Sequence, residues 1–153
     1  MLTQVVNKVS TTTTVVSSLN PSVFQQSVTF TATVTPGSPG TPTGTVNFFD
    51  GVTNIGSGPL SVGGTATLSL TTLTGGTHSI TAVYGGDANF ATSTSSALSQ
   101  VVNKADQTIT ITSTPPAFGA TVAPNHTYTI VATATSGLAV TFTIDGTSTS
   151  GCT

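Results

Sequence analysis

Apolar and polar residues alternate with a period of two through most of the first 104 residues. The clearest example is the segment 26–35, where every second residue from Val28 to Val34 is apolar and threonine fills most of the positions between. Such alternation is typical of β-strands that bury one face. The same pattern predicts two further inward-facing sets, Ala66, Leu68 and Leu70 in one segment and Ile80, Ala82 and Tyr84 in another.

Turn-forming dipeptides such as Asn20-Pro21, Asp50-Gly51 and Gly85-Gly86 separate the alternating segments. No stretch shows the apolar spacing of a helix, and a single open sheet would leave its apolar face uncovered. We therefore predict an all-β fold, an immunoglobulin-like antiparallel β-sandwich. Its seven strands are expected at 11–17, 26–35, 44–50, 53–57, 64–70, 77–84 and 95–103.

The chain repeats itself with an offset of 96 residues. The motif LTQVVNK at 2–8 recurs as LSQVVNK at 98–104. One unit of about 96 residues is close to the size of an immunoglobulin-like sandwich, about 100 residues. We predict three parts in a tandem array: the last strand of a preceding repeat (1–8), a complete Ig-like domain (9–104) and the N-terminal half of a second one (105–153).

The incomplete second unit is expected to carry strands near 107–113, 126–135 and 139–145. Its apolar face, which includes Tyr128 and Phe142, has no second sheet from its own sequence. A half-sandwich is expected to be unstable alone or to seek a partner. Residues 2–8 and 107–145 could support head-to-tail self-association by strand addition, because charged residues that block strand edges are scarce.

Charge is almost absent from this chain. Charged residues make up 4% of it, as two lysines and four acidic residues, and the formal net charge is −2. Threonine and serine, 36 and 18 residues, supply the polar strand faces instead. Two lysines cannot bind a phosphate backbone or an anionic membrane, so we expect no nucleic acid and no membrane insertion. No export signal is recognisable, and we expect one outside this sequence.

Short motifs are spread over 9–104, namely TTTTV at 11–15, NPSVF at 20–24, SVTFTATV at 27–34, PTGTV at 42–46, FDG at 49–51, GTHSI at 76–80 and YGGDANF at 84–90. Together they resemble the bacterial Ig-like repeats (group 3 type) of large secreted and surface proteins. The tail from Gln107 is similar to a related Ig-like module of such arrays. This resemblance implies a non-catalytic spacer or stalk in an adhesin-like protein, at the cell surface or outside the cell, with neighbouring Ig-like repeats as partners.

Asp50, Asp87 and Asp145 are the candidates for a metal site, because Ca²⁺ takes oxygen ligands. Asp50 and Asp145 precede glycine in turn signals, and Asp87 lies before the last strand, where a carboxylate can accept backbone N–H bonds. No acidic cluster is present. We therefore expect turn-forming roles and no cofactor, with Ca²⁺ as the alternative.

Catalysis is not expected. His78 and His126 stand at predicted strand ends without a carboxylate at ligand spacing along the chain, and no Gly-x-Ser-x-Gly motif is present. Phe49 and Phe90 are the candidates for a glycan-binding or protein-binding surface, because Phe49 follows the inward Phe48 and Phe90 falls in a loop. An adhesive module that uses such sandwich-end residues is the alternative function.

Cys152 is the single cysteine. The resemblance implies a second cysteine further along, so we expect Cys152 to be unpaired in this sequence because its partner is truncated. A fibre subunit assembled by β-strand complementation is the third functional reading.

Overall fold

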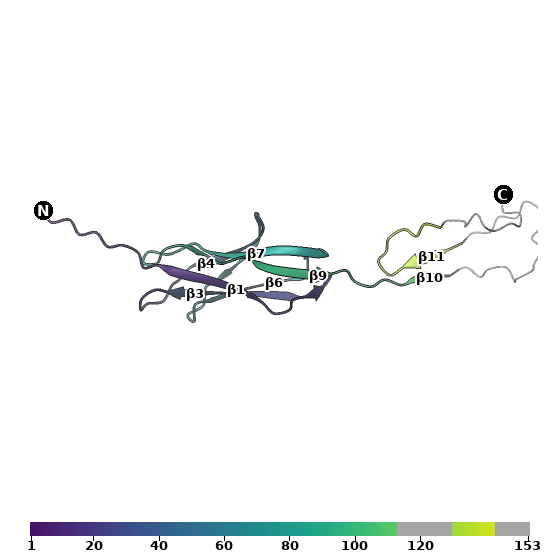
Figure 1. The fold of residues 1–153 in the computed structure, drawn as a ribbon, viewed down its shortest axis with the longest axis horizontal. Coiled ribbons are helices and arrows are strands. Elements are labelled where there is room, and N and C mark those ends of the chain that lie inside the picture. Colours follow the sequence, from purple (N-terminus) through teal and green to yellow (C-terminus); the bar gives the residue numbers. More distant parts are fainter. Residues whose placement is uncertain (113–129, 143–153) are drawn as a thin grey trace, which may run out of the picture. The chain divides into compact units, whose positions relative to one another are not determined.

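The computed structural model describes residues 1–112 and 130–142, and its regular elements there are strands. The chain divides into two compact units, Met1–Ala105 and Asp106–Thr153. Within the described ranges no helix is long and apolar enough to cross a membrane. The strands of the first unit (Figure 1) are β1 Thr11–Ser17, β2 Ser22–Val23, β3 Val28–Pro36, β4 Thr45–Asp50, β5 Thr53–Pro59, β6 Thr65–Leu70, β7 Gly76–Tyr84, β8 Ser93–Thr94 and β9 Leu98–Asn103.

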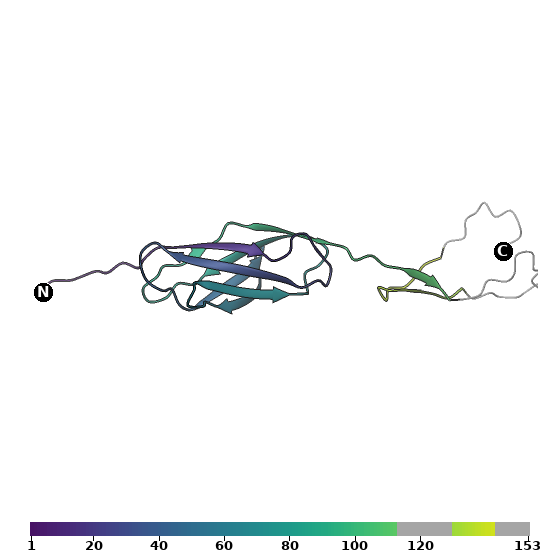
Figure 2. The ribbon, with the colours of Figure 1, turned by 90° about the horizontal axis from the view of Figure 1, so that it is seen from below.

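Two sheets pack face to face in the first unit, as the sandwich prediction requires (Figure 2). The smaller sheet has the order β1-β3-β6, and the larger sheet has the order β2-β9-β7-β4-β5, with β8 beside β7. The predicted Ig-like antiparallel β-sandwich is therefore confirmed. Two short pairings within it are parallel, namely β2 with β9 and the isolated bridge between Val9 and Phe90.

Each of the seven strands expected in the first unit is present, and β1 has the predicted bounds. The two-residue strands β2 and β8 were not predicted. The strand expected at 95–103 begins at Leu98 instead, because Ser95 interrupts the ladder beside β7. The Ser95 side chain accepts a hydrogen bond from the Ala82 N–H at 2.9 Å, while the Ser95 N–H donates to the Ala82 carbonyl.

Most of the core consists of residues that alternation placed inward, and the loop residues Leu73 and Phe90 complete it. In β3 the burial alternates along the strand, and Phe30 and Ala32 are fully buried. Leu68 and Leu70 are only partly buried but pack against the same cluster. The fully buried residues of the larger sheet include Val46, Phe48, Ile80, Ala82 and Tyr84.

The chain enters and leaves the first unit at opposite ends of the sandwich. Val9 donates its N–H to the Asn89 carbonyl and bridges to Phe90, just beyond the last residue of β7. At the other end of β7, Gly76 pairs with Val102 near the end of β9. The nine residues of β7 separate the two points, a distance of about 30 Å at 3.4 Å per residue.

Residues 1–8 form no strand in this structure. Their apolar side chains are exposed, Leu2 at 96% and Val6 at 86%. A strand needs a neighbouring strand, and the interpretation of 1–8 as the last strand of a preceding repeat places that neighbour in another unit. It stays a prediction.

In the second unit, β10 (Ile109–Ile111) pairs with β11 (Ala132–Ala134) in an antiparallel ladder. Both lie inside the segments expected to be strands. The third expected strand differs, because residues 139–142 form no strand and 143–145 lie outside the described residues. Exposed apolar side chains line this part of the chain, among them Ile111, Ile130, Leu138 and Phe142.

Candidate functional site

The candidate residues lie at the two ends of the sandwich in the first unit. β4 and β7 run antiparallel, so Asp50 at the end of β4 lies near the start of β7, whereas Asp87 follows the end of β7. We call the end with the loop 85–91 the Asp87 end and the end with the loop 71–75 the His78 end. The described residues contain no group of three or more His, Cys, Asp or Glu side chains that could hold a metal ion.

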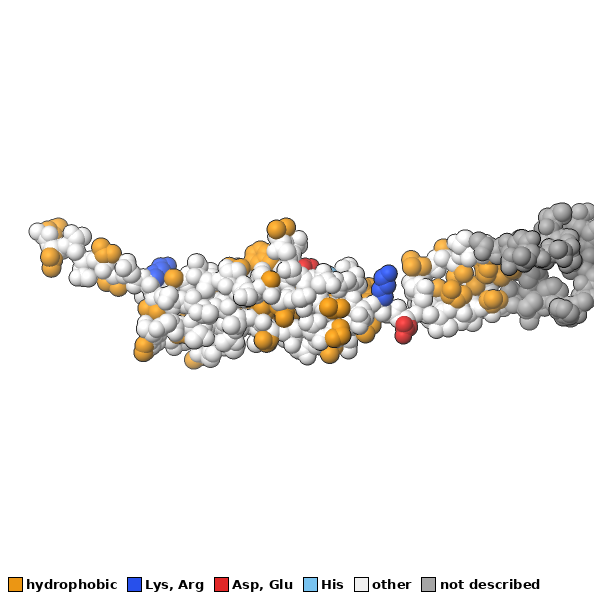
Figure 3. Space-filling model, viewed as in Figure 1, with side chains coloured by type: hydrophobic (Ala, Val, Ile, Leu, Met, Phe, Trp, Pro, Cys, Tyr) orange, Lys and Arg blue, Asp and Glu red, His pale blue; other side chains and the backbone are white. Residues whose placement is uncertain are grey.

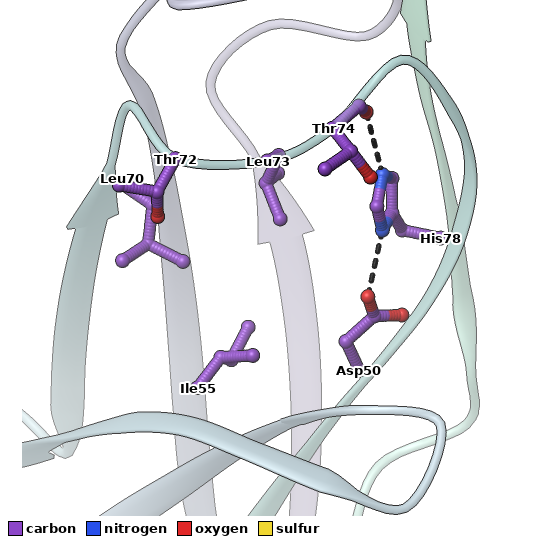
Figure 4. A pocket seen from close by; sticks show the side chains of 7 residues that line it. All are labelled: Asp50, Ile55, Leu70, Thr72, Leu73, Thr74 and His78. Carbon is purple, nitrogen blue, oxygen red and sulfur yellow. Dashed lines mark hydrogen bonds and ion pairs between the residues drawn. The ribbon is translucent and has the colours of Figure 1, made fainter.

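At the His78 end, the His78 ring lies between Asp50 and the loop before β7 (Figure 4). Its Nδ1 is 2.6 Å from Asp50 Oδ2, and its Nε2 is 2.9 Å from the Thr74 carbonyl oxygen. The other carboxylate oxygen of Asp50 accepts the Ser79 N–H at 3.1 Å. The side chains of His78 and Asp50 are 11% and 27% exposed.

This geometry favours a doubly protonated imidazole. A carbonyl oxygen can only accept a hydrogen bond, so Nε2 must carry a proton, and the carboxylate opposite Nδ1 accepts a second one. Burial alone would lower the pKa of His78, but the hydrogen bonds to Asp50 and Thr74 and the charge of Asp50 outweigh it, so the pKa of His78 is raised. His78 and Asp50 therefore form an ion pair that joins β4 to β7.

In the doubly protonated form both ring nitrogens of His78 donate, and the ring has no free lone pair. A general base or a metal ligand needs an unprotonated nitrogen. Spacing along the chain did not reveal the carboxylate partner of His78, because His78 and Asp50 are 28 residues apart in sequence and meet in space. The strand pattern places His78 on the same face as Ile80, but the pair with Asp50 also requires the β4–β7 register, in which Asp50 opposes Ile80.

Two shallow hollows open beside this ion pair. The first, of about 280 Å³, is lined by Ile55, Leu70 and Leu73 together with the His78–Asp50 pair. The second, of about 600 Å³, is lined by Phe24, Gln25, Thr71, Thr72 and Thr74. Phe24 is 41% exposed there.

At the Asp87 end, the carboxylate of Asp87 accepts hydrogen bonds from its own loop and from Thr43, which precedes β4. Oδ1 accepts the N–H groups of Asn89 and Phe90, both at 2.8 Å. Oδ2 accepts the N–H and the hydroxyl of Thr43, both at 2.9 Å. The turn-fixing role expected for Asp87 is confirmed by these contacts.

Backbone donors also set the charge state of Asp87. Desolvation alone would raise the pKa of its carboxyl, but the N–H groups of Asn89, Thr43 and Phe90 outweigh this and hold that pKa well below its usual range. Burial, with the charge of Asp87 next, raises the pKa of the neighbouring Tyr84 hydroxyl, which donates to the Thr43 carbonyl at 2.9 Å. Lys8 Nζ donates to the Asp87 carbonyl at 2.6 Å.

The two aromatic candidates differ in exposure. Phe90 is only 6% exposed and belongs to the core cluster, so it closes the Asp87 end instead of presenting a ring to solvent. The Phe90 ring leaves no room for a side chain at position 40, because a Cβ on Gly40 would lie 2.7 Å from Phe90 Cζ. Phe49 is partly exposed on β4. Sequence reasoning did not select Phe24, the more exposed loop aromatic.

Asp50 also begins the turn that was predicted for it. It pairs with Thr53 across a two-residue loop in which Gly51 has a φ of +56°, a conformation that glycine adopts readily. Asp145 and Cys152 lie outside the described residues, as does His126.

Comparison with family profiles agrees with this architecture. The profile of the bacterial Ig-like domain (group 3) matches residues 6–103. Among solved structures, the chain is similar to fibronectin(III)-like modules of Clostridium thermocellum CbhA, with 23% sequence identity and a TM-score of 0.45. The similarity covers 80% of this chain and 61% of that one. No curated protein matches the chain.

Proposed function

The chain belongs to the bacterial Ig-like domain (group 3) family, and from this premise we propose that it is a non-catalytic spacer in a bacterial extracellular or cell-surface repeat protein. In this proposal the first unit is one segment of a stalk, and neighbouring Ig-like repeats are its partners.

The observation that carries the proposal is the position of the two chain ends of the first unit. Val9 is fixed at the Asp87 end, and β9 finishes at Asn103 at the His78 end. A domain whose ends are at opposite poles adds its full length to an array. Each unit would contribute about 30 Å from its strands alone.

The chemistry at the two ends supports a structural role. The hydrogen-bonding atoms of His78 and the carboxylate of Asp87 are engaged with the protein's own backbone and side chains. Asp50 and Asp87 stand at opposite ends of β4 and β7, so they do not form a carboxylate pair around one bond. These residues hold loops in place instead of presenting reactive groups.

Small-angle X-ray scattering of concatenated units tests this function. Proteins with one, two and four copies of 9–104 should increase in maximum dimension by a constant amount of at least about 30 Å per copy, while the cross-section stays the same.

A matched series in which a flexible Gly-Ser linker replaces Lys104 between copies provides the control. It should show a smaller increase per copy, because a flexible chain grows only with the square root of its length. If the native and Gly-Ser series are equally compact, the unit is not a spacer.

A further inference from the structure

The segment 2–7 repeats the sequence of β9 but not its surroundings. Five of the six residues are identical, and the single difference, Thr3 in place of Ser99, falls at an exposed position of β9. In the structure, β9 lies in a slot between β7 and β2. The segment 2–7 is exposed and its apolar side chains face solvent (Figure 3).

β9 fills its slot through two inward side chains. Gln100 is fully buried, and its Nε2 donates to the Leu19 carbonyl at 2.9 Å and to Ser22 Oγ at 3.4 Å. Val102 is 4% exposed and belongs to the core cluster. Gln4 and Val6 occupy the equivalent positions in the segment 2–7.

Leu98, which is matched by Leu2, also packs against the core cluster. The hydrogen bonds of β9 to Asn20 and Phe24 involve its backbone. Asn20 Nδ2 donates to the Ser99 carbonyl at 2.7 Å, and Asn20 Oδ1 accepts the Val101 N–H at 2.9 Å. The Phe24 N–H donates to the Asn103 carbonyl at 2.8 Å. Any strand with the same inward side chains could make these bonds.

The segment 2–7 also shares a local contact with β9. Gln100 Nε2 donates to the carbonyl of the next residue, Val101, at 3.0 Å, and Gln4 Nε2 donates to the carbonyl of Val5 at 3.2 Å. The glutamine side chain therefore turns toward the following peptide group in both segments.

We propose that the segment 2–7 is an interchangeable β9 strand, which takes the slot between β2 and β7 in a second copy of this unit when the β9 of that copy is displaced. In that register Gln4 takes the place of Gln100, and Val6 takes the place of Val102. The inference does not depend on the spacer function, because it concerns only the fit of one strand to one slot.

The chain's own β9 normally occupies the slot, because a tethered strand has a much higher effective concentration than a strand from another molecule. We therefore expect exchange only where the resident strand is disabled. Val102→Asp does this, since it puts a carboxylate into the core without a partner.

Size-exclusion chromatography with light scattering on the full chain tests the exchange. The V102D variant should form head-to-tail species at multiples of the chain mass. The double variant V6D/V102D removes the donor strand as well, and it should not form them. Multimers of V102D that persist in the double variant would be non-specific aggregates, and they would overturn the proposal.

A peptide of residues 1–8 tests the same slot even if V102D alone does not fold. The fluorescently labelled peptide should bind V6D/V102D. Binding should raise the fluorescence anisotropy of the peptide and restore the strand signal of the protein in circular dichroism. The same peptide carrying Val6→Asp should bind at least about tenfold more weakly. If neither peptide changes the anisotropy and V102D stays monomeric, the segment 2–7 is not a β9 strand.

Discussion

The two ends of the sandwich are closed by different chemistry. At the Asp87 end a carboxylate accepts backbone N–H groups two and three residues further along the chain, and the buried Phe90 ring fills the space beneath. At the His78 end an imidazole joins residues 28 apart, and the loop aromatic Phe24 remains 41% exposed beside open hollows. One end is held by groups that keep their charge at neutral pH, and the other by a pair that can titrate.

The largest expected difference between the ends concerns the two loop phenylalanines. Phe90→Ala should lower the free energy of unfolding by about 3–5 kcal/mol, as for a large aromatic removed from a packed core. Phe24→Ala is the matched change at the His78 end and should cost about 1 kcal/mol or less, because that ring is partly in solvent. Urea denaturation of both variants measures this, and equal losses would show that the two ends are packed alike.

The two aspartates should respond differently to loss of charge. In Asp87→Asn, the NH₂ group of the new amide faces a backbone N–H group in either orientation. Both groups are donors, and a backbone N–H cannot become an acceptor, so a hydrogen bond is lost. In Asp50→Asn, His78 can lose its Nδ1 proton and accept from the new amide, while Nε2 still donates to Thr74. At pH 8 the thermal midpoint should therefore fall clearly in D87N and little in D50N. A fall in D50N as large as in D87N would contradict this assignment of protons.

On the alkaline side, pH should affect the His78 end. The pKa of His78 is raised in the folded state from its ordinary value of 6.5. The stabilising contribution is therefore complete below pH 6.5 and is lost as pH rises through the raised pKa. The loss should be about 1 kcal/mol or less, since the pair is partly exposed. D50N should remove this dependence. Denaturation of the wild-type chain and of D50N from pH 5 to pH 9 checks this. If the free energy of unfolding falls with pH equally steeply in D50N, another group is responsible for the titration.

At acidic pH, the Asp87 end should be the one whose stability depends on pH. The pKa of the Asp87 carboxyl is held below its ordinary value of 3.8, so its contribution is present above pH 3.8 and is lost as pH falls further. The thermal midpoint of the wild-type chain should therefore approach that of D87N between about pH 4 and pH 2. A gap between them that stays constant down to pH 2 would show that protonation of Asp87 is not the cause.

The contrast between the ends also explains what the sequence could predict. The contacts of Asp87 with Asn89 and Phe90 are local, so a turn signal with an aspartate at this position was enough to anticipate them. The contacts of Asp87 with Thr43, which is 44 residues away, were not anticipated. The His78–Asp50 pair required the β4–β7 register, which depends on tertiary packing. The alternation in β3 predicted its buried face because each inward position there is apolar.

The edges of the larger sheet were harder to predict for a related reason. Fully buried Gln100 is polar and sits where alternation expects an apolar residue, because its amide satisfies the Leu19 carbonyl across the β2–β9 edge. Ser95 likewise accepts the Ala82 N–H of β7 with its side-chain hydroxyl, where a backbone carbonyl would accept it in a regular ladder. Such substitutions of a side chain for a backbone partner depend on non-local geometry, so the sequence pattern does not reveal them.

The smallest expected effect compares the two junction lysines. Lys8 and Lys104 each follow the sequence Val-Val-Asn, and both are exposed. Lys8 Nζ donates to the Asp87 carbonyl at 2.6 Å, and a solvent-exposed contact of this kind contributes at most about 1 kcal/mol. Lys8→Met should therefore change global stability only slightly, with Lys104→Met as the matched control at the other end.

The local consequence of Lys8→Met should be easier to detect. Val9 and the loop 85–91 are joined by hydrogen bonds from Val9 to Asn89 and from Ala91 to Val9, and Lys8 ties the same loop from the preceding residue. Without that contact the Val9 and Ala91 amides should exchange hydrogen faster, because the junction opens more often. Equal exchange in K8M and K104M would mean that Lys8 does not stabilise the entry of the chain into the sandwich.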